Sequence, residues 1–235
     1  MEIPYVHTDV QGINPVQLAR EMCQDANKIV VFSGSGLSAE SGIPTYRDDQ
    51  DGFWKQFDAD TYATREGFKK QPAKVINQYK EWRKALQDFE PNKGHYAIAS
   101  NDRVIHVTQN VDDLAERAGG TNVLHLHGNL LKDRIDEELG IARPDVVWYG
   151  EGLPIDVFGA ASEAIEMADV VISVGASGEV FPAASLLDQS LLASDTQTIL
   201  VNPNPVAHMG AFDIVLHDLA ANVLPVILAP QEVVA

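Results

Sequence analysis

Short runs of apolar residues recur along the chain, separated by longer segments with a different spacing. The strongest runs are short, apolar and largely β-branched, as is typical of strands buried on both faces of a parallel sheet. They occupy residues 29–32, 104–107, 170–174 and 198–201. Weaker runs at 123–126 and 214–216 predict further strands.

The segments between these runs have the length and periodicity of helices. Asn14 followed by Pro15 is a helix-start signal, and apolar residues then recur at helical spacing up to Ala26. Further helices are expected at 112–118, 158–168 and 183–192. Because strands alternate with helices, we predict an α/β fold with a doubly wound, Rossmann-like parallel sheet.

Two segments interrupt this alternation. Residues 43–100 carry aromatic and charged residues at helical spacing without an apolar strand, and residues 129–145 form a short polar stretch. We therefore predict a Rossmann-like domain and two additions to it. The domain comprises 1–42, 101–128 and 146–235, with an inserted helical module at 43–100 and a short remnant segment at 129–145.

Charge and composition limit the classes of partner. The 235 residues carry a formal charge of −17, which opposes nonspecific binding to nucleic acid or to anionic membranes. The acidic surface could attract basic peptides, or could serve solubility alone. The single cysteine, Cys23, rules out an internal disulfide and a multi-cysteine metal site.

The chain has no run of about 18 apolar residues of the kind that spans a membrane. Its first residues, MEIPY, lack the basic and apolar regions of a signal peptide. We therefore expect a cytoplasmic protein.

A glycine-rich turn follows the first strand, with the sequence SGSGLSAESG at residues 33–42. Such a turn lets backbone N–H groups approach a pyrophosphate. Ala39 could fill the third small-residue position of a dinucleotide fingerprint. The acidic residue expected about 20 positions later has only Asp58 and Asp60 as candidates, and neither follows a strand. A plain dehydrogenase is therefore disfavoured.

The turn continues as SGIPTYR at 41–47, and further motifs follow in a fixed order. They are TQNVD at 108–112, HG at 127–128, RPDVVWYGE at 143–151, GAS at 175–177 with PAA at 182–184, and Asn202. In this order and over residues 15–228, the chain resembles the sirtuins, which are NAD-consuming protein lysine deacylases. The resemblance implies NAD as co-substrate and acylated lysine in proteins or peptides as substrate.

His127 would be the general base, since an imidazole titrates near neutral pH. By resemblance, it would deprotonate the ribose after the acyl-lysine oxygen displaces nicotinamide, and Asn110 and Asp112 would orient the ribose, a water and the carboxamide. On the residues alone, a His beside Gly is more often structural, and Asn and Asp before a helix are common caps. We interpret His125 as a neighbour of His127 or as a packing residue, without a catalytic role of its own.

The resemblance also implies two sets of binding residues. NAD would contact Gly34, Ser35, Gly36, Ser38, Ala39, Tyr46, Arg47, Gln109, Gly175, Ser177, Asn202 and Leu219. The substrate would contact Tyr79, Trp82, Arg83, Val147, Trp148, Tyr149, Gly150 and Glu151. Residues 147–151 would pair with the substrate backbone as an added strand, and Trp148 would line the acyl-lysine tunnel. Without the resemblance, this segment would be a buried strand.

The chain departs from the family in the region where sirtuins carry two cysteine pairs for a structural zinc. Residues 129–142 contain no Cys, and His125 and His127 cannot replace four ligands, so we predict no structural zinc. Ser35 and Ala176 stand where relatives usually have Ala and Thr.

A second departure concerns the acyl group. Ala39, Glu40 and Thr45 resemble the branch that removes succinyl or malonyl groups, which places Tyr-x-x-Arg on a helix. Here Trp82 follows Tyr79 in place of that Arg, and Arg83 lies about 100° further round the helix. We therefore hypothesise a preference for neutral acyl groups. In the alternative, Trp82 packs in the core and Arg83 reaches the acyl site.

Two other functions remain open at this point. The same NAD site could serve an NAD hydrolase or a protein ADP-ribosyltransferase, and dependence of nicotinamide release on acyl-lysine separates these from a deacylase. A catalytically silent NAD-binding protein is opposed by the presence of Asn110, Asp112 and His127. Neither nucleic acid nor a membrane is an expected partner, and the pattern is compatible with a monomer.

Overall fold

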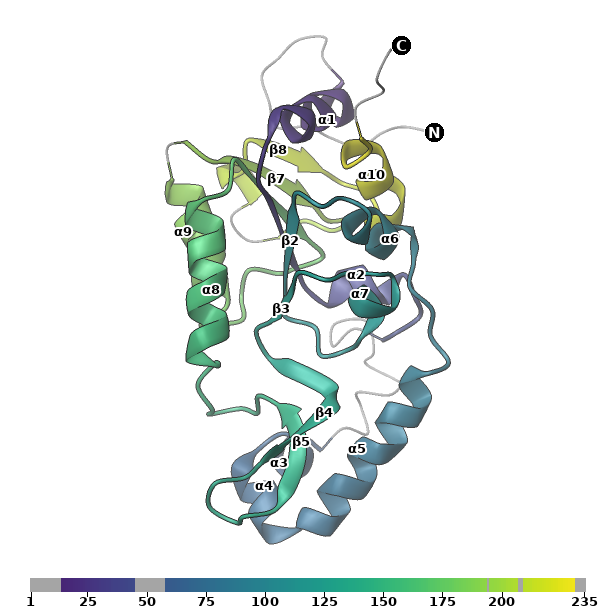
Figure 1. The fold of residues 1–235 in the computed structure, drawn as a ribbon, viewed down its shortest axis with the longest axis vertical. Coiled ribbons are helices and arrows are strands. Elements are labelled where there is room, and N and C mark those ends of the chain that lie inside the picture. The colour runs from purple at the N-terminus through teal and green to yellow at the C-terminus, as the bar shows by residue number, and fades with distance from the viewer. Residues whose placement is uncertain (1–13, 45–57, 194, 207–208, 231–235) are drawn as a thin grey trace.

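The computed structural model describes residues 14–44, 58–193, 195–206 and 209–230 (Figure 1). Its centre is a six-stranded parallel sheet with the strand order β3-β2-β1-β6-β7-β8. The strands are β1 Ile29–Ser33, β2 Val104–Thr108, β3 Val123–His125, β6 Val170–Val174, β7 Gln197–Val201 and β8 Ile214–Leu216. The predicted α/β fold and all six strands are confirmed.

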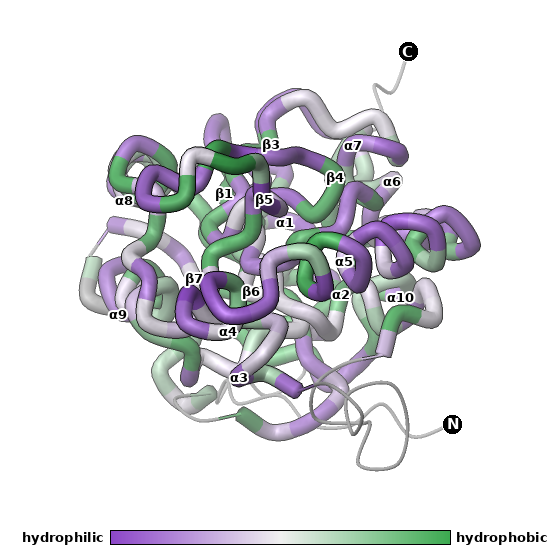
Figure 2. Tube along the Cα trace, turned by 90° about the horizontal axis from the view of Figure 1, so that it is seen from below, coloured by the Kyte–Doolittle hydropathy of each residue, from purple (hydrophilic) through white to green (hydrophobic). Residues whose placement is uncertain are grey.

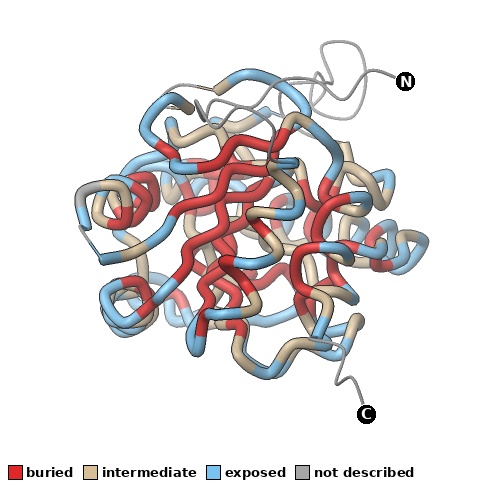
Figure 3. Tube along the Cα trace, turned by 90° about the horizontal axis from the view of Figure 1, so that it is seen from above, coloured by how far each residue is buried: buried red, intermediate tan, exposed pale blue. Residues whose placement is uncertain are grey.

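Helices cover both faces of this sheet. One face packs against α1 Pro15–Asp25, α6 Lys93–Ala99 and α10 Ala220–Ile227, and the other against α8 Ile155–Glu166 and α9 Ala184–Leu192. The Asn14 side chain accepts the N–H of Val16, which confirms the expected start of α1. The central strands are buried on both sides, as the red segments of Figure 3 show. Across the described residues, the structure holds no helix that is long and apolar enough to cross a bilayer.

A smaller module lies beside the carboxyl ends of the strands (Figure 1). It contains α3 Ala59–Tyr62, α4 Arg65–Lys70, α5 Pro72–Leu86, and the antiparallel hairpin of β4 Gly128–Ile135 and β5 Ala142–Val146. These elements share a core of their own that includes Phe68 and Trp148. Figure 2 looks at the molecule from this end and shows α5 as largely hydrophilic, with shorter hydrophobic stretches.

The module differs from the sequence prediction at two points. Helix α6 lies within the predicted insertion at 43–100, yet it packs against α10 on the large sheet. The polar segment at 129–145 forms the hairpin β4–β5. Its strand pattern is hard to read in the sequence because few of its side chains, such as Leu130 and Val146, enter the module core.

The strand register brings the loops of the site together. Ser33 at the end of β1 lies opposite Thr108 of β2 and Val174 of β6, and Thr108 lies opposite His125 of β3. The segments after these strands therefore leave the sheet at one edge, which is where open α/β sheets bind ligands.

Candidate functional site

The glycine-rich turn after β1 is held against the turn after β6. Helix α2 Ser35–Ala39 begins here, and the N–H of Gly36 donates to the Gly175 carbonyl at 3.0 Å. A Cβ on Gly36 would lie 2.6 Å from the Gly175 Cα, so only glycine allows this approach. Gly175 also has a φ of +55°, a conformation that other residues rarely adopt. Ser35 is exposed at the start of α2.

Four of the predicted site residues form one hydrogen-bonded group. The Asn110 amide donates to the Ser38 hydroxyl at 2.9 Å and to the Gly34 carbonyl at 3.1 Å. The Ser38 hydroxyl in turn donates to the Asp112 carboxylate at 2.8 Å. Burial raises the pKa of Asp112, although Ser38 opposes the shift. The structure therefore brings Asn110, Asp112 and the glycine-rich turn together, as the sequence predicted.

Asp112 also explains why the next helix is shorter than expected. Its carboxylate accepts the N–H of Leu114 at 3.2 Å, and helix α7 spans Leu114–Arg117 rather than 112–118. The first residues of the predicted helix are thus a turn that presents a carboxylate to Ser38.

His127 is oriented by the loop after β2. Its Nδ1 lies 3.1 Å from the Gln109 carbonyl, which can only accept, so Nδ1 carries the ring proton. The N–H of Gln109 is bound in turn by the Ser33 carbonyl at 2.9 Å. Burial lowers the pKa of His127, so the ring is neutral near pH 7 with a lone pair on Nε2. This is the protonation state that a general base requires.

His125 contributes more than the packing role that we expected. Its Nδ1 lies 2.9 Å from the Asn110 carbonyl, and its Nε2 lies 2.8 Å from the Glu116 carboxylate. Burial opposes a charge on the ring, but these two acceptors raise the pKa of His125. His125 therefore holds the backbone of Asn110, as His127 holds that of Gln109. His127 lies in the turn after β3, and no spacing rule in the sequence indicated Glu116 as a partner of His125.

The remaining predicted NAD contacts lie near the ends of β6, β7 and β8. The Ser177 hydroxyl accepts the N–H of Glu179, and the Asn202 amide donates to the Ala176 carbonyl at 3.3 Å. Leu219 is the exposed N-cap residue of α10. Ala39 lies on α2, and Tyr46, Arg47 and Thr45 lie outside the described residues.

Glu40 was not predicted as a site residue. Its two carboxylate oxygens accept the N–H groups of Ala220 and Ala221, at 2.7 and 3.0 Å. It thereby ties the glycine-rich turn to the start of α10, beside Leu219. The only sign of this role in the sequence was the position of Glu40 within the glycine-rich motif at 33–42.

Tyr79 and Trp148 face each other inside the small module. The Trp148 Nε1–H donates to the Tyr79 hydroxyl at 2.8 Å, and that hydroxyl donates to the Tyr62 carbonyl at 3.1 Å. Tyr79 is only 4% exposed, and burial raises its pKa to about 12. Trp82 packs edge-on against Tyr79, with ring centroids 4.7 Å apart. The polar atoms of Tyr79 and Trp148 are thus already engaged with each other.

Arg83 points toward the hairpin. Its guanidinium donates to the carbonyls of Leu130 and Lys132, the latter at 2.7 Å, and to the Asp133 carboxylate at 2.7 Å. Trp82 packs against the module core, as one half of the alternative has it, while Arg83 is held at the hairpin in this structure. Three acceptors on β4 hold its side chain there.

Residues 147–151 form an irregular segment rather than the expected strand. The N–H groups of Val147 and Tyr149 donate to the carbonyls of His127 and Ala63, and that of Trp148 donates to the Glu151 carboxylate. A single bridge pairs Tyr149 with Thr64. The N–H groups of three consecutive residues here are therefore bound within the protein.

Glu151 was predicted to contact the substrate, but its side chain is engaged inside the module. Its carboxylate binds Arg143 and, at 2.8 Å, Arg134. Arg143 also pairs with Asp136 at 3.3 Å, and its guanidinium lies 4.1 Å from the centroid of the Trp148 ring. Arg143, Asp136 and Glu151 are 4%, 3% and 11% exposed, so this is a buried ion-pair cluster. It joins the hairpin β4–β5 to the segment that follows it.

The donor atoms of this cluster do not suit a zinc ion, because the guanidinium groups already neutralise both carboxylates. Within the described ranges, no group of three or more His, Cys, Asp or Glu side chains could hold a metal ion.

Comparison with known proteins adds a family and a set of relatives. The Sir2 family model matches residues 34–137 and 131–182. A Mycobacterium tuberculosis protein named NAD-dependent protein deacylase is 40% identical over 86% of this chain and 96% of its own length. A Methylococcus capsulatus protein of the same name is 41% identical over 87% of this chain and 92% of its own.

Solved structures match closely as well. A Sir2 homologue in complex with NAD has a TM-score of 0.79 and 33% identity, covering 94% of this chain and 96% of the other. Sir2Af2 bound to a myristoylated histone peptide has a TM-score of 0.69 and 28% identity, covering 91% and 94%.

Proposed function

The chain belongs to the Sir2 family, and from this premise we propose that it is an NAD-dependent protein deacylase. The observation that carries the proposal is the arrangement of His127. A neutral imidazole with its proton on Nδ1 is bound to the carbonyl of Gln109, the residue that precedes Asn110 of the group formed by Asn110, Ser38 and Asp112. Relatives at about 40% identity carry the same name over most of their length.

The residues at the strand ends fit NAD. Gly36 and Gly175 approach each other closely because neither has a side chain, so the turn presents backbone groups to a ligand. Asn202 follows β7 directly, and Leu219 lies between β8 and α10. Bound NAD would supply the ribose that accepts the acyl group when nicotinamide leaves. Asn110 and Asp112 would orient the ribose and carboxamide, and His127 Nε2 would take a ribose hydroxyl proton.

The substrate that we propose is acylated lysine in proteins or peptides. A structural relative binds a myristoylated histone peptide, which carries a long neutral acyl group. In this chain Trp82 occupies the position expected of an arginine, and Arg83 is held by β4. Because no guanidinium stands beside Tyr79 from this helix, we expect acetyl or longer apolar groups to be preferred over succinyl.

We also propose that the small module is stable without zinc. The buried cluster of Arg143, Asp136 and Glu151 supplies charge-assisted contacts across the hairpin, and the chain has one cysteine. Metal analysis of the purified protein should find less than one zinc per ten chains, and a chelator should leave the unfolding temperature unchanged. A stoichiometric zinc that the chelator removes with loss of stability would contradict this. The cytoplasmic location stays a prediction.

The decisive experiment measures nicotinamide release from NAD with and without an acetyl-lysine peptide. We expect release to require the peptide, to yield free lysine and to vanish in His127→Ala. An unchanged unfolding temperature of the variant would show that only the base was lost. Release that does not depend on peptide would instead identify an NAD hydrolase or an ADP-ribosyltransferase.

A further inference from the structure

Two histidines hold the two peptide groups on either side of the Asn110 Cα. His127 Nδ1 donates to the Gln109 carbonyl at 3.1 Å, and His125 Nδ1 donates to the Asn110 carbonyl at 2.9 Å. Because peptide groups are planar, each residue has only two soft backbone torsion angles. Fixing both flanking groups therefore fixes φ and ψ of Asn110, and with them the direction in which its side chain leaves the backbone.

The contacts of His125 require a proton on each ring nitrogen. Its Nδ1 faces a carbonyl oxygen and its Nε2 lies 2.8 Å from the Glu116 carboxylate, and both of these oxygens can only accept. Burial works against a charge on either group, but the hydrogen bond between them raises the pKa of His125 and lowers that of Glu116. The ring is therefore an imidazolium paired with a carboxylate, unlike the neutral ring of His127.

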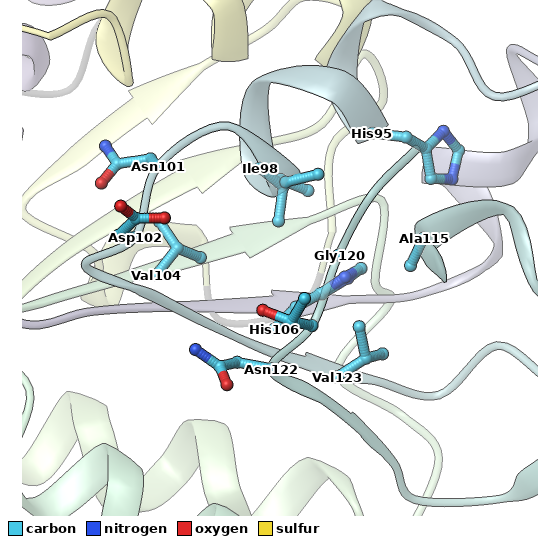
Figure 4. Close-up of a pocket in the computed structure, with 12 residues that line it drawn as sticks. His95, Ile98, Asn101, Asp102, Val104, His106, Ala115, Gly120, Asn122 and Val123 are labelled. Atoms are coloured by element: carbon cyan, nitrogen blue, oxygen red, sulfur yellow. The ribbon is translucent and has the colours of Figure 1, made fainter. Parts of the chain in front are cut away.

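The other charged groups around His125 come from three further elements. Asp112 and Asp113, in the turn before α7, favour a positive ring. Lys132 on β4 acts on the partner carboxylate and lowers its pKa. His106 on β2, which lines the cavity shown in Figure 4, is neutral because burial lowers its pKa to about 3. The charges that face the ring directly are thus negative.

Glu116 ties the ring to two elements that flank the site. Glu116 itself belongs to helix α7, and the Asn129 amide on β4 donates to the same carboxylate oxygen at 3.4 Å. A rotation of the His125 ring away from Asn110 would therefore also break its contact with Glu116. The ring is held in the orientation that presents Nδ1–H to the Asn110 carbonyl.

We propose that His125 is a positioning residue for deacylation: its doubly protonated ring, held by Glu116, fixes the backbone of Asn110 and so the amide that orients the nicotinamide ribose. This role rests on the proposed function of the site, in which Asn110 and Asp112 orient the ribose and the carboxamide. A displacement of about 1 Å in an active site can cost about 100-fold in rate. Loss of the Nδ1 contact should therefore lower kcat more than it changes peptide binding.

Two replacements separate the two nitrogens of the ring. His125→Asn keeps an N–H donor near the position of Nδ1, and His125→Gln keeps one near the position of Nε2. At saturating NAD, we expect kcat to fall at least about tenfold in His125→Gln and to stay within about threefold of the wild type in His125→Asn. KM for the acetyl-lysine peptide should change by less than about threefold in both.

Each of these variants loses one hydrogen bond of the ring, so their unfolding temperatures should be alike. A difference in kcat between them then reports the contact with Asn110 and not a general loss of stability. Equal losses of kcat in the two variants would show a merely structural role and overturn the proposal.

NMR of the histidine ring nitrogens in the protein without NAD tests the charge on His125 independently of activity. At pH 6.5, where an ordinary histidine is about half protonated, both nitrogens of His125 should carry protons, and Glu116→Gln should leave one, on Nδ1. Glu90→Gln is the matched control, because it removes only the surface pair with Arg117 at 2.9 Å, and it should leave the ring unchanged.

A neutral His125 in the wild type, or a ring that keeps both protons in Glu116→Gln, would overturn the proposal while leaving the deacylase function in place. Failure of the proposed function looks different. The wild type would then release no nicotinamide in response to the peptide although His125 is doubly protonated, and the role of His125 in deacylation would be overturned with it.

Discussion

Replacing Glu151 with Gln should destabilise the small module far more than an ordinary surface charge change. The carboxylate binds the buried Arg143, pairs with Arg134 at 2.8 Å and accepts the N–H of Trp148 at 2.9 Å. Gln keeps the size of the side chain and one acceptor oxygen but removes the charge. Arg143 would then remain in the core with only Asp136 as its counter-charge.

The magnitude follows from the burial of the pair. Removing one partner of a buried ion pair costs roughly 3–5 kcal/mol, and because Asp136 stays in place we expect about 3 kcal/mol. A domain of ordinary stability has a total of about 5–15 kcal/mol, so the loss is easily measured. Glu138→Gln is the matched control, because Glu138 pairs with Lys69 at the surface, where such a pair contributes about 0–1 kcal/mol.

Urea denaturation at pH 7 would measure both free energies of unfolding, and peptide kinetics would measure the effect on the substrate segment. Because Glu151 holds the Trp148 amide, its loss should raise KM for an acyl-lysine peptide several-fold while KM for NAD stays the same. Equal, small losses of stability in the two variants would refute the reasoning that the cluster organises this module.

Three further predictions concern the site. Tyr79→Phe should lower the free energy of unfolding by about 2 kcal/mol, because it leaves the buried Trp148 N–H without a partner, whereas Tyr96→Phe at the surface should change it little; equal effects would contradict the buried pair. Because burial lowers the pKa of His127, kcat/KM should fall with acidification only at a pH below that expected for an ordinary histidine, and a pH profile with an inflection above about 6.5 would oppose this. Trp82→Arg should raise the succinyl-to-acetyl ratio of kcat/KM at least tenfold through a charge-assisted hydrogen bond, and Trp82→Met should not; a similar ratio in both variants would sink the assignment of this position to acyl selection.

The module at the carboxyl ends was only partly readable from the sequence. The helical character of the insertion was evident from aromatic and charged residues at helical spacing, and α3, α4 and α5 confirm it. The hairpin at 128–146 was missed, since it has few buried side chains and is stabilised by Arg143, Asp136 and Glu151. Ion pairs between positions distant in sequence leave no periodic pattern.

For the site, sequence order identified Asn110, Asp112 and His127, and the structure places the first two in one hydrogen-bonded group. The role of His125 depends on Glu116 and on the carbonyl of Asn110, which only the fold brings within reach. The sequence left two orientations open for Arg83, because helical spacing tells where a side chain leaves the helix but not where a long, flexible side chain ends. Acceptors on β4 decide between them.

The sequence by itself determined the parallel sheet, since buried β-branched strands and intervening helices are local patterns. It also determined the family, because the order of short motifs along the chain can be read without knowing which residues are in contact. The tertiary structure decided which polar groups meet: the hydroxyl of Tyr79 with the indole of Trp148, Arg143 with two carboxylates, and His125 with Glu116. Burial and hydrogen bonding are properties of what surrounds a residue, and distant parts of the chain supply those surroundings only after folding.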